Sequence, residues 1–241
     1  MPIEKHGFSI IIPTRGRGRE LKRAIDSVLI QTYIDWELII VNDGGPEPDR
    51  IDDPRIKYLT QDRLNKAYAR NLGMENATKE WICWLDDDDA YVNCYLEVLN
   101  QCINEYPEYK LFNFGGILYR AKGERFSEQF RDTILREPFE HEDHAFFVAG
   151  KIATGHFIFH RDLLADPEAG PIPKEINPYL FGDNMKTRFP ELMTHYGPLY
   201  MQMGKELGNP WGDDFAQYYI LTRKYKHKVL PFNLYIQFCR V

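Results

Sequence analysis

The sequence predicts an α/β protein with a mostly parallel central sheet flanked by helices. Short apolar runs rich in β-branched residues alternate with segments of helical periodicity through about the first 110 residues. Such alternation is typical of a parallel sheet that carries helices on both faces. The remainder has many prolines, glycines and aromatic residues and a weaker pattern. We expect a single domain over 1–241, with a regular part, 1–107, and an irregular part, 108–241.

The regular part contains four apolar runs that we interpret as buried strands. The first run ends at a proline, and the fourth leads directly into four aspartates. Short apolar runs bounded by turn residues fit strands that are covered on both faces. The predicted strands span 8–13, 37–41, 55–60 and 81–85.

Three helices are predicted between and after these strands. In the first, Leu21, Ile25 and Val28 recur at the spacing that gathers apolar side chains on one helix face. The third is stopped by Pro107, because proline lacks the amide hydrogen that a helix interior needs. The predicted helices span 18–32, 65–77 and 94–106.

The irregular part contains fewer clear elements. Its apolar runs predict strands at 109–120, 153–160 and 229–238, and its helical spacing predicts one helix at 213–224. No repeat or low-complexity tract interrupts either part.

Composition excludes several functional classes. The chain has 241 residues, 44% of them hydrophobic, and a formal net charge of −6, which argues against a nucleic-acid binder driven by phosphate attraction. No apolar run approaches the roughly 20 residues of a membrane span, and the first residues lack the layout of a secretory signal. The four cysteines form no CxxC pair. We therefore expect a cytoplasmic protein with free thiols, whose contact with a membrane is at most peripheral.

Polar clusters follow three of the predicted strands, at the point where each strand ends. They are Pro13-Thr14-Arg15, Asn42-Asp43-Gly44 and Asp86 to Asp89. Ligands of open parallel sheets bind at the carboxyl ends of the strands. We therefore expect the three clusters to lie along one edge and to form the site.

The four consecutive aspartates are the strongest single signal. Two like charges about 4 Å apart repel by about 1 kcal/mol in water, so a bound cation would offset a real cost. In an extended segment, Asp86 and Asp88 share one side and Asp87 and Asp89 share the other. Carboxylates at a ligand crevice suit Mg²⁺ or Mn²⁺. The alternative is a solvated loop in which one aspartate caps the next helix.

Taken together, these clusters resemble the motifs of the family 2 glycosyltransferases, which have the GT-A fold. The resemblance runs through about residues 7–100 in unbroken order and is looser at 154–164 and 212–223. Five short motifs carry it: Ile12-Pro13-Thr14-Arg15, Ser27-Val28-Leu29-Ile30-Gln31-Thr32-Tyr33, Val41-Asn42-Asp43-Gly44, Ala69-Arg70-Asn71-Leu72-Gly73 and Leu85-Asp86-Asp87-Asp88-Asp89.

The resemblance implies a nucleotide-sugar donor, with a uridine diphosphate sugar favoured. It places Asp43 on the nucleotide base, with Pro13, Thr14 and Arg15 bordering the base pocket. It places Arg70 near the base and the diphosphate; the alternative for Arg70 is an ordinary surface position on a helix.

The acidic run is implied to hold the donor's ribose and the metal. Asp86 would contact the ribose or a metal-bound water, and Asp87 is grouped with the donor-binding residues. Asp88 would bind Mn²⁺ or Mg²⁺ directly, with Asp89 as a second ligand if the strand ends there. A divalent cation there stabilises the charge that develops on the leaving diphosphate.

The catalytic base is expected in the irregular part. Gly212-Asp213-Asp214 resembles the family's Gly-Glu-Asp motif, whose last carboxylate is the base, so Asp214 takes that role and Asp213 replaces the usual glutamate. Direct displacement by the activated hydroxyl would invert the anomeric carbon. The alternative is that these carboxylates only cap a helix.

Three further residues are candidates for the acceptor side. They are His156, Trp211 and Asp183. His156 could instead be a packed histidine, and Trp211 either stacks on a sugar ring or belongs to the core. The acceptor could be a glycan, a protein or a lipid-linked sugar.

Two other functions are consistent with parts of the sequence. A sugar nucleotidyltransferase would need a glycine-rich, lysine-containing loop after the first strand, and the segment 14–19 has the glycines and arginines but no lysine. A non-catalytic nucleotide-sugar-binding module would not need Asp43, Asp88 and Asp214 together.

Overall fold

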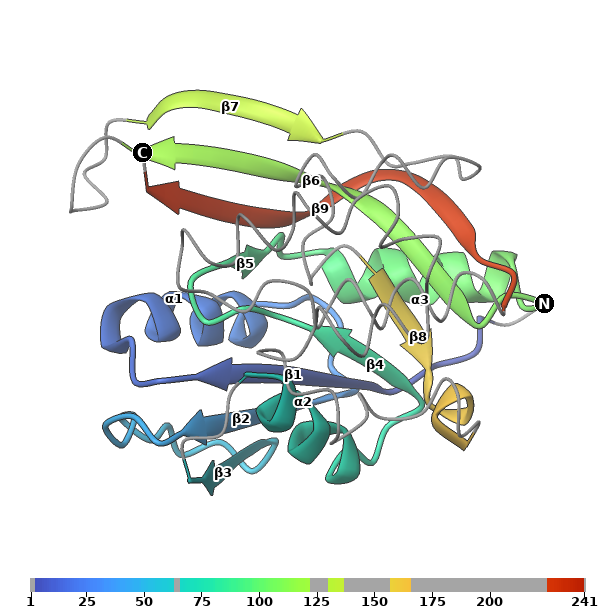
Figure 1. Ribbon diagram of the computed structural model, residues 1–241. Coiled ribbons are helices and arrows are strands. Elements are labelled where there is room, and N and C mark those ends of the chain that lie inside the picture. The colour runs from blue at the N-terminus through green and yellow to red at the C-terminus, as the bar shows by residue number, and fades with distance from the viewer. Residues whose placement is uncertain (1–2, 63–65, 122–129, 137–156, 166–224, 241) are drawn as a thin grey trace, which may run out of the picture.

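The computed structural model describes residues 3–62, 66–121, 130–136, 157–165 and 225–240. Helices and strands alternate in its first part (Figure 1). The strands are β1 (Phe8–Thr14), β2 (Trp36–Asp43), β3 (Ile56–Gln61), β4 (Trp81–Trp84), β5 (Ala90–Tyr91), β6 (Leu111–Ala121), β7 (Phe130–Arg136), β8 (Phe157–His160) and β9 (Lys228–Arg240). The helices are α1 (Gly18–Leu29), α2 (Lys66–Glu75), α3 (Tyr95–Glu105) and the 3₁₀ helix η3 (Arg161–Ala165).

All of the described strands join one sheet. Its order is β3-β2-β1-β4-β8-β6-β9-β5, and β7 pairs with β6 off this path. The first four strands in this order are parallel to one another, with Ile11 of β1 lying between Ile39 of β2 and Trp84 of β4. Strand β1 lies between β2 and β4, so the connection that leaves β1 runs to one side of the sheet and the chain that leaves β4 runs to the other. Open α/β sheets bind ligands at such a point, beyond the carboxyl ends of the two strands.

The irregular part of the sequence extends the sheet beyond β4. Strand β8 runs antiparallel to β4, β6 antiparallel to β8, and β9 parallel to β6. The register of β9 slips between Leu230 and Asn233, and Pro231 lies in this irregularity. A proline fits there because it has no amide hydrogen to give to a sheet ladder.

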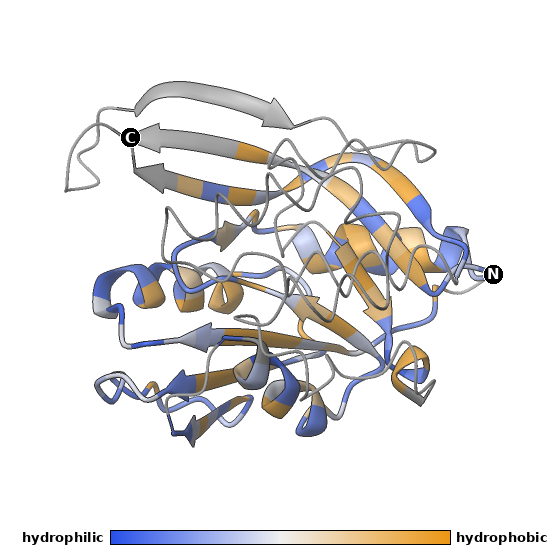
Figure 2. Cartoon of the chain, viewed as in Figure 1, coloured by the Kyte–Doolittle hydropathy of each residue, from blue (hydrophilic) through white to orange (hydrophobic). Residues whose placement is uncertain are grey.

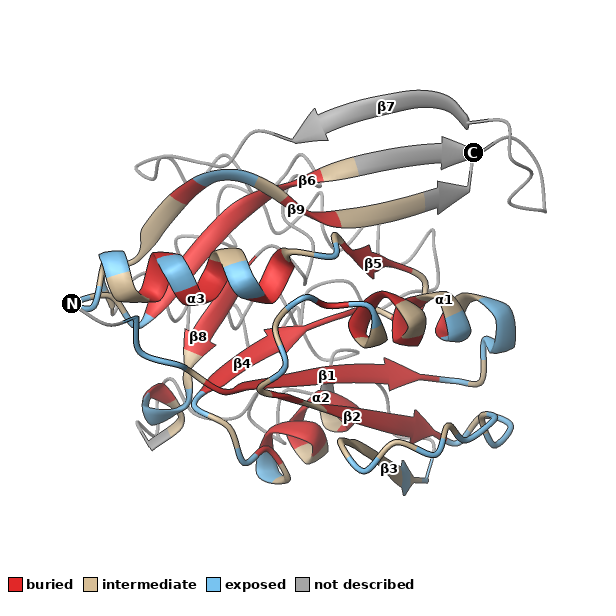
Figure 3. Cartoon of the chain, turned by 180° about the vertical axis from the view of Figure 1, so that it is seen from behind, coloured by how far each residue is buried: buried red, intermediate tan, exposed pale blue. Residues whose placement is uncertain are grey.

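Two buried cores cover the two faces of the sheet. Helices α1 and α3 pack on one face and α2 on the other (Figures 1 and 3). The alternation of side chains along β1 explains both cores, because Ile10 and Ile12 face α1 and α3 while Ile11 faces α2. Figure 2 shows the same division, with apolar strands at the centre and helices that are apolar on one side.

The structure confirms the predicted α/β class with its mostly parallel central sheet, and corrects several details. Helix α1 ends at Leu29 rather than at Thr32. The two-residue β5 and the five-residue η3 were not predicted because segments so short give no periodic signal, and β7 was not predicted because its sequence, Phe-Arg-Asp-Thr-Ile-Leu-Arg, lacks an apolar run. Residues 153–156 of one predicted strand and all of the predicted helix 213–224 lie outside the described residues. None of the helices in the described part is long and apolar enough to cross a membrane.

Candidate active site

The carboxyl end of β1 is tied directly to the acidic run after β4, hereafter the acidic tip (Asp86 to Asp89). Thr14 Oγ1 donates a hydrogen bond of 2.7 Å to Asp87 Oδ2 and accepts one of 3.1 Å from the Gly16 amide. Asp87 is buried. Burial raises the pKa of its carboxyl to about 6, although Arg17 and Thr14 partly oppose this.

The carboxyl end of β2 places Asp43 beneath Arg15. Asp43 is only 1% exposed; its Oδ2 accepts from Arg15 Nε at 2.9 Å and its Oδ1 accepts from Gln61 Nε2 at 2.7 Å. The Arg15 side chain is 47% exposed, so it covers the carboxylate from the solvent side. Access of a nucleotide base to Asp43 therefore depends on how Arg15 is placed.

The turn after β2 is shaped by its own side chains. The Asn42 amide group donates to the carbonyl oxygens of Gly45 and Pro46, and Asn42 Oδ1 accepts from the Gly45 amide at 2.9 Å. Gly44 has a positive φ of 71°, a conformation that glycine adopts at little cost. The turn brings the backbone of Gly45 against that of Arg15.

Helix α2, which covers the face of the sheet opposite to α1 and α3, contributes Arg70. Its side chain is fully buried, which excludes the surface position considered above, and Nη2 lies 2.8 Å from Asp86 Oδ1. The guanidinium carbon also lies 5.6 Å from the ring centroid of Trp84, the last residue of β4. A buried cation is thus held next to the first residue of the acidic tip.

The acidic tip is a turn, so the prediction of an extended segment was wrong. The Asp89 amide donates to the Asp86 carbonyl at 3.1 Å, which closes the turn. Burial still alternates along it: Asp87 and Asp89 are buried, whereas the side chains of Asp86 and Asp88 are 27% and 35% exposed. The physical reason is that β4 ends at Trp84 and the chain must reverse to begin β5.

Two arginines that were not predicted to belong to the site hold Asp88. Arg17 donates to Asp88 Oδ2 and lies 3.4 Å from Asp87 Oδ1, while Arg23 donates to the Asp88 carbonyl. Burial alone would lower the pKa of Arg17, but Asp87 and Asp88 outweigh it and raise this pKa. Both arginines come from the glycine- and arginine-rich segment and the helix α1 that follows it.

Asp89 faces away from its exposed neighbours. Its Oδ2 accepts a hydrogen bond from the Tyr235 hydroxyl at 2.5 Å and its Oδ1 accepts from the Phe238 amide at 3.0 Å. Burial raises the pKa of this carboxyl well above its ordinary value. Both partners lie on β9, at the far end of the sequence, so no local pattern pointed to them.

The remaining predicted site residues divide into two groups. Pro13 is buried within β1, opposite Val41 of β2. Five others lie outside the described residues: His156, Asp183, Trp211, Asp213 and Asp214. Thr14, Arg15, Asp43, Arg70 and the acidic tip are therefore the predicted residues that the described structure brings to one edge of the sheet.

Two carboxylates of the acidic tip are the residues that could hold a hard cation. Over the described ranges, no group of three or more His, Cys, Asp or Glu side chains is arranged to hold a metal ion. Mg²⁺ is usually bound through one or two carboxylates, with substrate phosphates and water completing its shell. The two partly exposed carboxylates, Asp86 and Asp88, meet that requirement, and Asp88 already attracts a cationic side chain.

Relatives of known name match the chain over part of their length. A glucosyltransferase of Campylobacter jejuni that acts on GalNAc(5)-diNAcBac-PP-undecaprenol is 30% identical over 170 residues, covering 65% of this chain and 52% of that protein. The Escherichia coli enzyme WfgD, a UDP-Glc:α-D-GlcNAc-diphosphoundecaprenol β-1,3-glucosyltransferase, is 32% identical over 122 residues, covering 46% and 48%. The match with the glycosyltransferase GlyA of Streptococcus pneumoniae covers only 20% of that protein's length.

A solved structure and a family model complete the comparison. The S. aureus TarS fragment 1–349 superposes with a TM-score of 0.60 at 15% sequence identity, covering 96% of this chain and 60% of that one. The same fragment in complex with UDP-GlcNAc gives a TM-score of 0.58 at 14% identity, covering 98% and 59%. These likenesses support the predicted GT-A fold. The model of glycosyl transferase family 2 matches residues 9–166, so the chain belongs to that family, as its motifs predicted.

Proposed function

We propose that the chain is a metal-dependent, inverting glycosyltransferase that moves a sugar from a nucleotide diphosphate sugar to an acceptor hydroxyl. One observation carries the proposal. Polar residues at the carboxyl ends of β1, β2 and β4, together with Arg70 of helix α2, form hydrogen-bonded pairs along one edge of the sheet: Thr14 with Asp87, Arg15 with Asp43, and Arg70 with Asp86. Membership of glycosyl transferase family 2 supports the reaction class.

A uridine diphosphate sugar is the donor that we favour. Asp43 would accept a hydrogen bond from the base once Arg15 moves aside, and the partial exposure of Arg15 allows that movement. Pro13 and Thr14 lie at the neighbouring strand end and would border the same pocket. The name of WfgD includes UDP-Glc and the TarS fragment was solved with UDP-GlcNAc, and both support a uridine nucleotide.

The acidic tip would bind the diphosphate end of the donor through Mn²⁺ or Mg²⁺. Asp88 would hold the cation, and Asp86, which Arg70 orients, would contact the ribose or a water on the metal. Such a cation, when bound, stabilises negative charge on the leaving diphosphate. Arg17 and Arg70 lie beside these carboxylates and add fixed positive charge near the same phosphates.

The acceptor would be activated by a carboxylate of the irregular part. We assign this role to Asp214, with Asp213 next to it, on the basis of the Gly-Asp-Asp motif. Two of the relatives act on sugars linked to undecaprenyl diphosphate, so we favour a lipid-linked sugar as the acceptor class. His156, Trp211 and Asp183 are our candidates for contacts with it.

Incubation of the purified chain with a panel of UDP-sugars, with and without Mn²⁺, tests the proposal. We expect slow, Mn²⁺-dependent release of UDP in water, accelerated by an acceptor that carries a sugar on polyprenyl diphosphate. The variant Asp88→Asn should lose this release, whereas the control Asp162→Asn, which alters an exposed aspartate paired with Lys110, should keep it.

Two outcomes would refute the proposal. Pyrophosphate formed from a nucleoside triphosphate and a sugar phosphate would instead identify a nucleotidyltransferase. Tight binding of UDP-sugars with no turnover, under any of the metals and acceptors supplied, would identify a binding module.

A further inference from the structure

We propose that Asp89 is a positioning residue that fastens the acidic tip to strand β9, and that the Tyr235 hydroxyl sets the geometry of the tip's two partly exposed carboxylates, Asp86 and Asp88. This inference rests on the proposed function, because it assigns the purpose of the fastening to the binding of the donor's metal. It also removes Asp89 from the set of predicted metal ligands.

The contacts of Asp89 give the first reason. Both of its carboxylate oxygens accept hydrogen bonds from β9, one from the Tyr235 hydroxyl and one from the Phe238 amide. Asp89 is 2% exposed and Tyr235 is fully buried, so the pair lies in the interior. To turn toward a cation in the crevice, Asp89 would have to give up these bonds and leave the buried Tyr235 hydroxyl and the Phe238 amide without their partner.

Arg23 provides a second link between the tip and the same stretch of β9. The Arg23 guanidinium carbon lies 3.7 Å from the ring centroid of Phe238, and Arg23 also donates to the carbonyl of Asp88. The backbone of Phe238 is thus bonded to Asp89, and its ring lies under a side chain that holds Asp88. Two adjacent residues of the tip are tied to one residue of β9.

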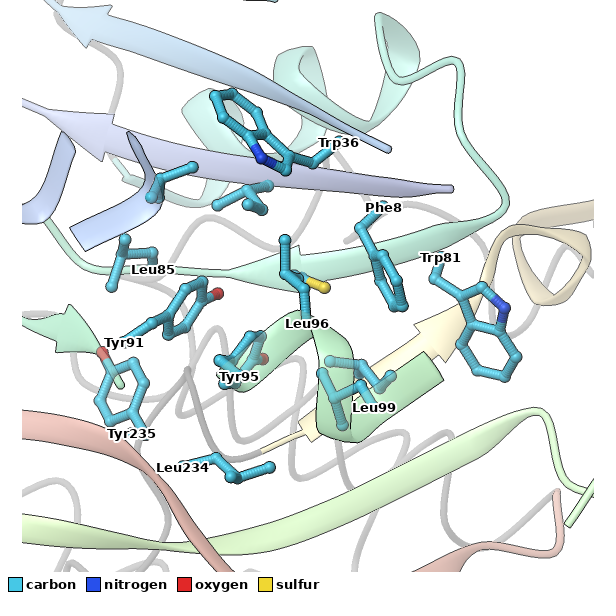
Figure 4. Close-up of a cluster of buried hydrophobic side chains, with 14 of the residues drawn as sticks. Phe8, Trp36, Trp81, Leu85, Tyr91, Tyr95, Leu96, Leu99, Leu234 and Tyr235 are labelled. Carbon is cyan, nitrogen blue, oxygen red and sulfur yellow. The ribbon is translucent and has the colours of Figure 1, made fainter. Parts of the chain in front are cut away.

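The tyrosine that donates to Asp89 is itself held in a ring cluster (Figure 4). Its ring lies edge-on to Tyr91 at 6.0 Å, and Tyr91 stacks on Tyr95 at 3.7 Å. The Tyr91 hydroxyl donates to the carbonyl of Trp84, the last residue of β4, at 2.6 Å. The ring cluster therefore fixes the end of the strand that leads into the tip and also the donor to the tip's last residue.

These links hold the tip on either side of Asp88. Thr14 holds Asp87 from β1, and Tyr235 holds Asp89 from β9, so the intervening Asp88 has little freedom to move. A small divalent ion demands near-ideal octahedral geometry, and partners that orient its ligands commonly contribute 10- to 100-fold in metal affinity. The buried carboxylates Asp87 and Asp89 thus position the partly exposed carboxylates Asp86 and Asp88.

The variant Tyr235→Phe tests this inference, because it removes one hydroxyl and keeps the ring in its cluster. We expect its affinity for Mn²⁺ in the presence of UDP, measured by electron paramagnetic resonance of the free ion, to fall about 10- to 100-fold. Tyr33→Phe is the matched control: its hydroxyl donates to the His6 carbonyl at 2.9 Å, among contacts outside the tip, and we expect it to bind Mn²⁺ like the wild type.

A second readout needs no metal. Hydrogen exchange at the Asp89 amide, which closes the turn, should be faster in Tyr235→Phe than in the wild type and unchanged in Tyr33→Phe. Thermal unfolding shows whether either variant has lost the fold. If the wild type binds no Mn²⁺ but exchange at the tip is faster in Tyr235→Phe, the proposed metal dependence is wrong. The attachment of the tip to β9 through Asp89 and Tyr235 is then still supported.

Two results would overturn the inference. One is a Tyr235→Phe variant with wild-type Mn²⁺ affinity and wild-type exchange at the tip. The other is an Asp89→Asn variant that loses Mn²⁺ as completely as Asp88→Ala, while Tyr235→Phe has no effect. That second pattern would make Asp89 a metal ligand.

Discussion

The close approach of Gly45 to Arg15 predicts that one methyl group added at position 45 has a large effect on the protein. A Cβ at position 45 would lie 2.2 Å from the Arg15 carbonyl oxygen and 2.3 Å from its carbonyl carbon. That is more than 1 Å closer than an ordinary van der Waals contact between such atoms. Since both partners are backbone, no side chain can rotate to relieve the overlap, and the loop after β1 must move.

The effect of Gly45→Ala follows from what that loop holds. Overpacking of this kind commonly costs about 1–3 kcal/mol of unfolding free energy. The larger effect should be on binding, because Arg15 is bonded to Asp43 and a shifted loop would disturb the hydrogen bond proposed between Asp43 and the base. A hydrogen bond to a charged group contributes about 1.5–3 kcal/mol, which is roughly 10- to 100-fold in affinity. We expect UDP affinity, measured by calorimetry, to fall by about that factor.

Gly18 provides the control from the same segment. A Cβ there meets nothing within 4 Å, so Gly18→Ala should bind UDP normally and gain about 0.4–1 kcal/mol of stability from the less flexible unfolded chain. Equal UDP affinity and equal urea stability of Gly45→Ala and the wild type would refute the reasoning.

Three further predictions concern other parts of the molecule. Asp88→Ala should abolish Mn²⁺-stimulated release of UDP while circular dichroism shows an intact fold; full activity would exclude this residue from the metal site. Asp214→Asn should reduce turnover at least about 100-fold with little change in donor affinity, since a general base contributes about that much to the rate; an unchanged rate would place the base elsewhere. Burial would raise the pKa of Glu37, but hydrogen bonds from Ser9 and Thr78 outweigh it and lower this pKa, so its contribution to stability is present above the unfolded-state pKa and is lost as pH falls through the folded one. Urea unfolding of the wild type and Glu37→Gln should therefore differ at pH 7, and the difference should shrink as pH falls below the ordinary glutamate pKa of about 4.3; a difference that stays constant into strong acid would contradict this assignment.

Periodicity alone located most of the first half of the fold. Strand β1 was expected at 8–13 and is found at Phe8–Thr14, with all of its residues buried. A short run of apolar residues fits a central strand of a parallel sheet, because such a strand is covered by helices on both faces. The convergence of Thr14, Asp43 and the acidic tip also followed from the sequence, since the ends of parallel strands share an edge.

The contacts that complete the site could not be predicted in this way. The bond from Tyr235 to Asp89 joins residues separated by 146 positions, and local pattern carries no information on such pairs. Arg70 was assigned to the site only through a family motif, because a helix periodicity cannot show that an arginine is buried against Asp86. The turn at the acidic tip was missed because four identical residues have no period to detect.

The late position of β9 in the sequence has a consequence for synthesis. Translation produces the acidic tip long before Tyr235 and Phe238, so on the ribosome Asp89 has neither of its two partners. Until β9 emerges and inserts between β6 and β5, the nascent polypeptide also lacks the side chains that cover Tyr91. A chain released before β9 is made would therefore carry the acidic residues without the geometry, and competence for binding would arrive only with β9.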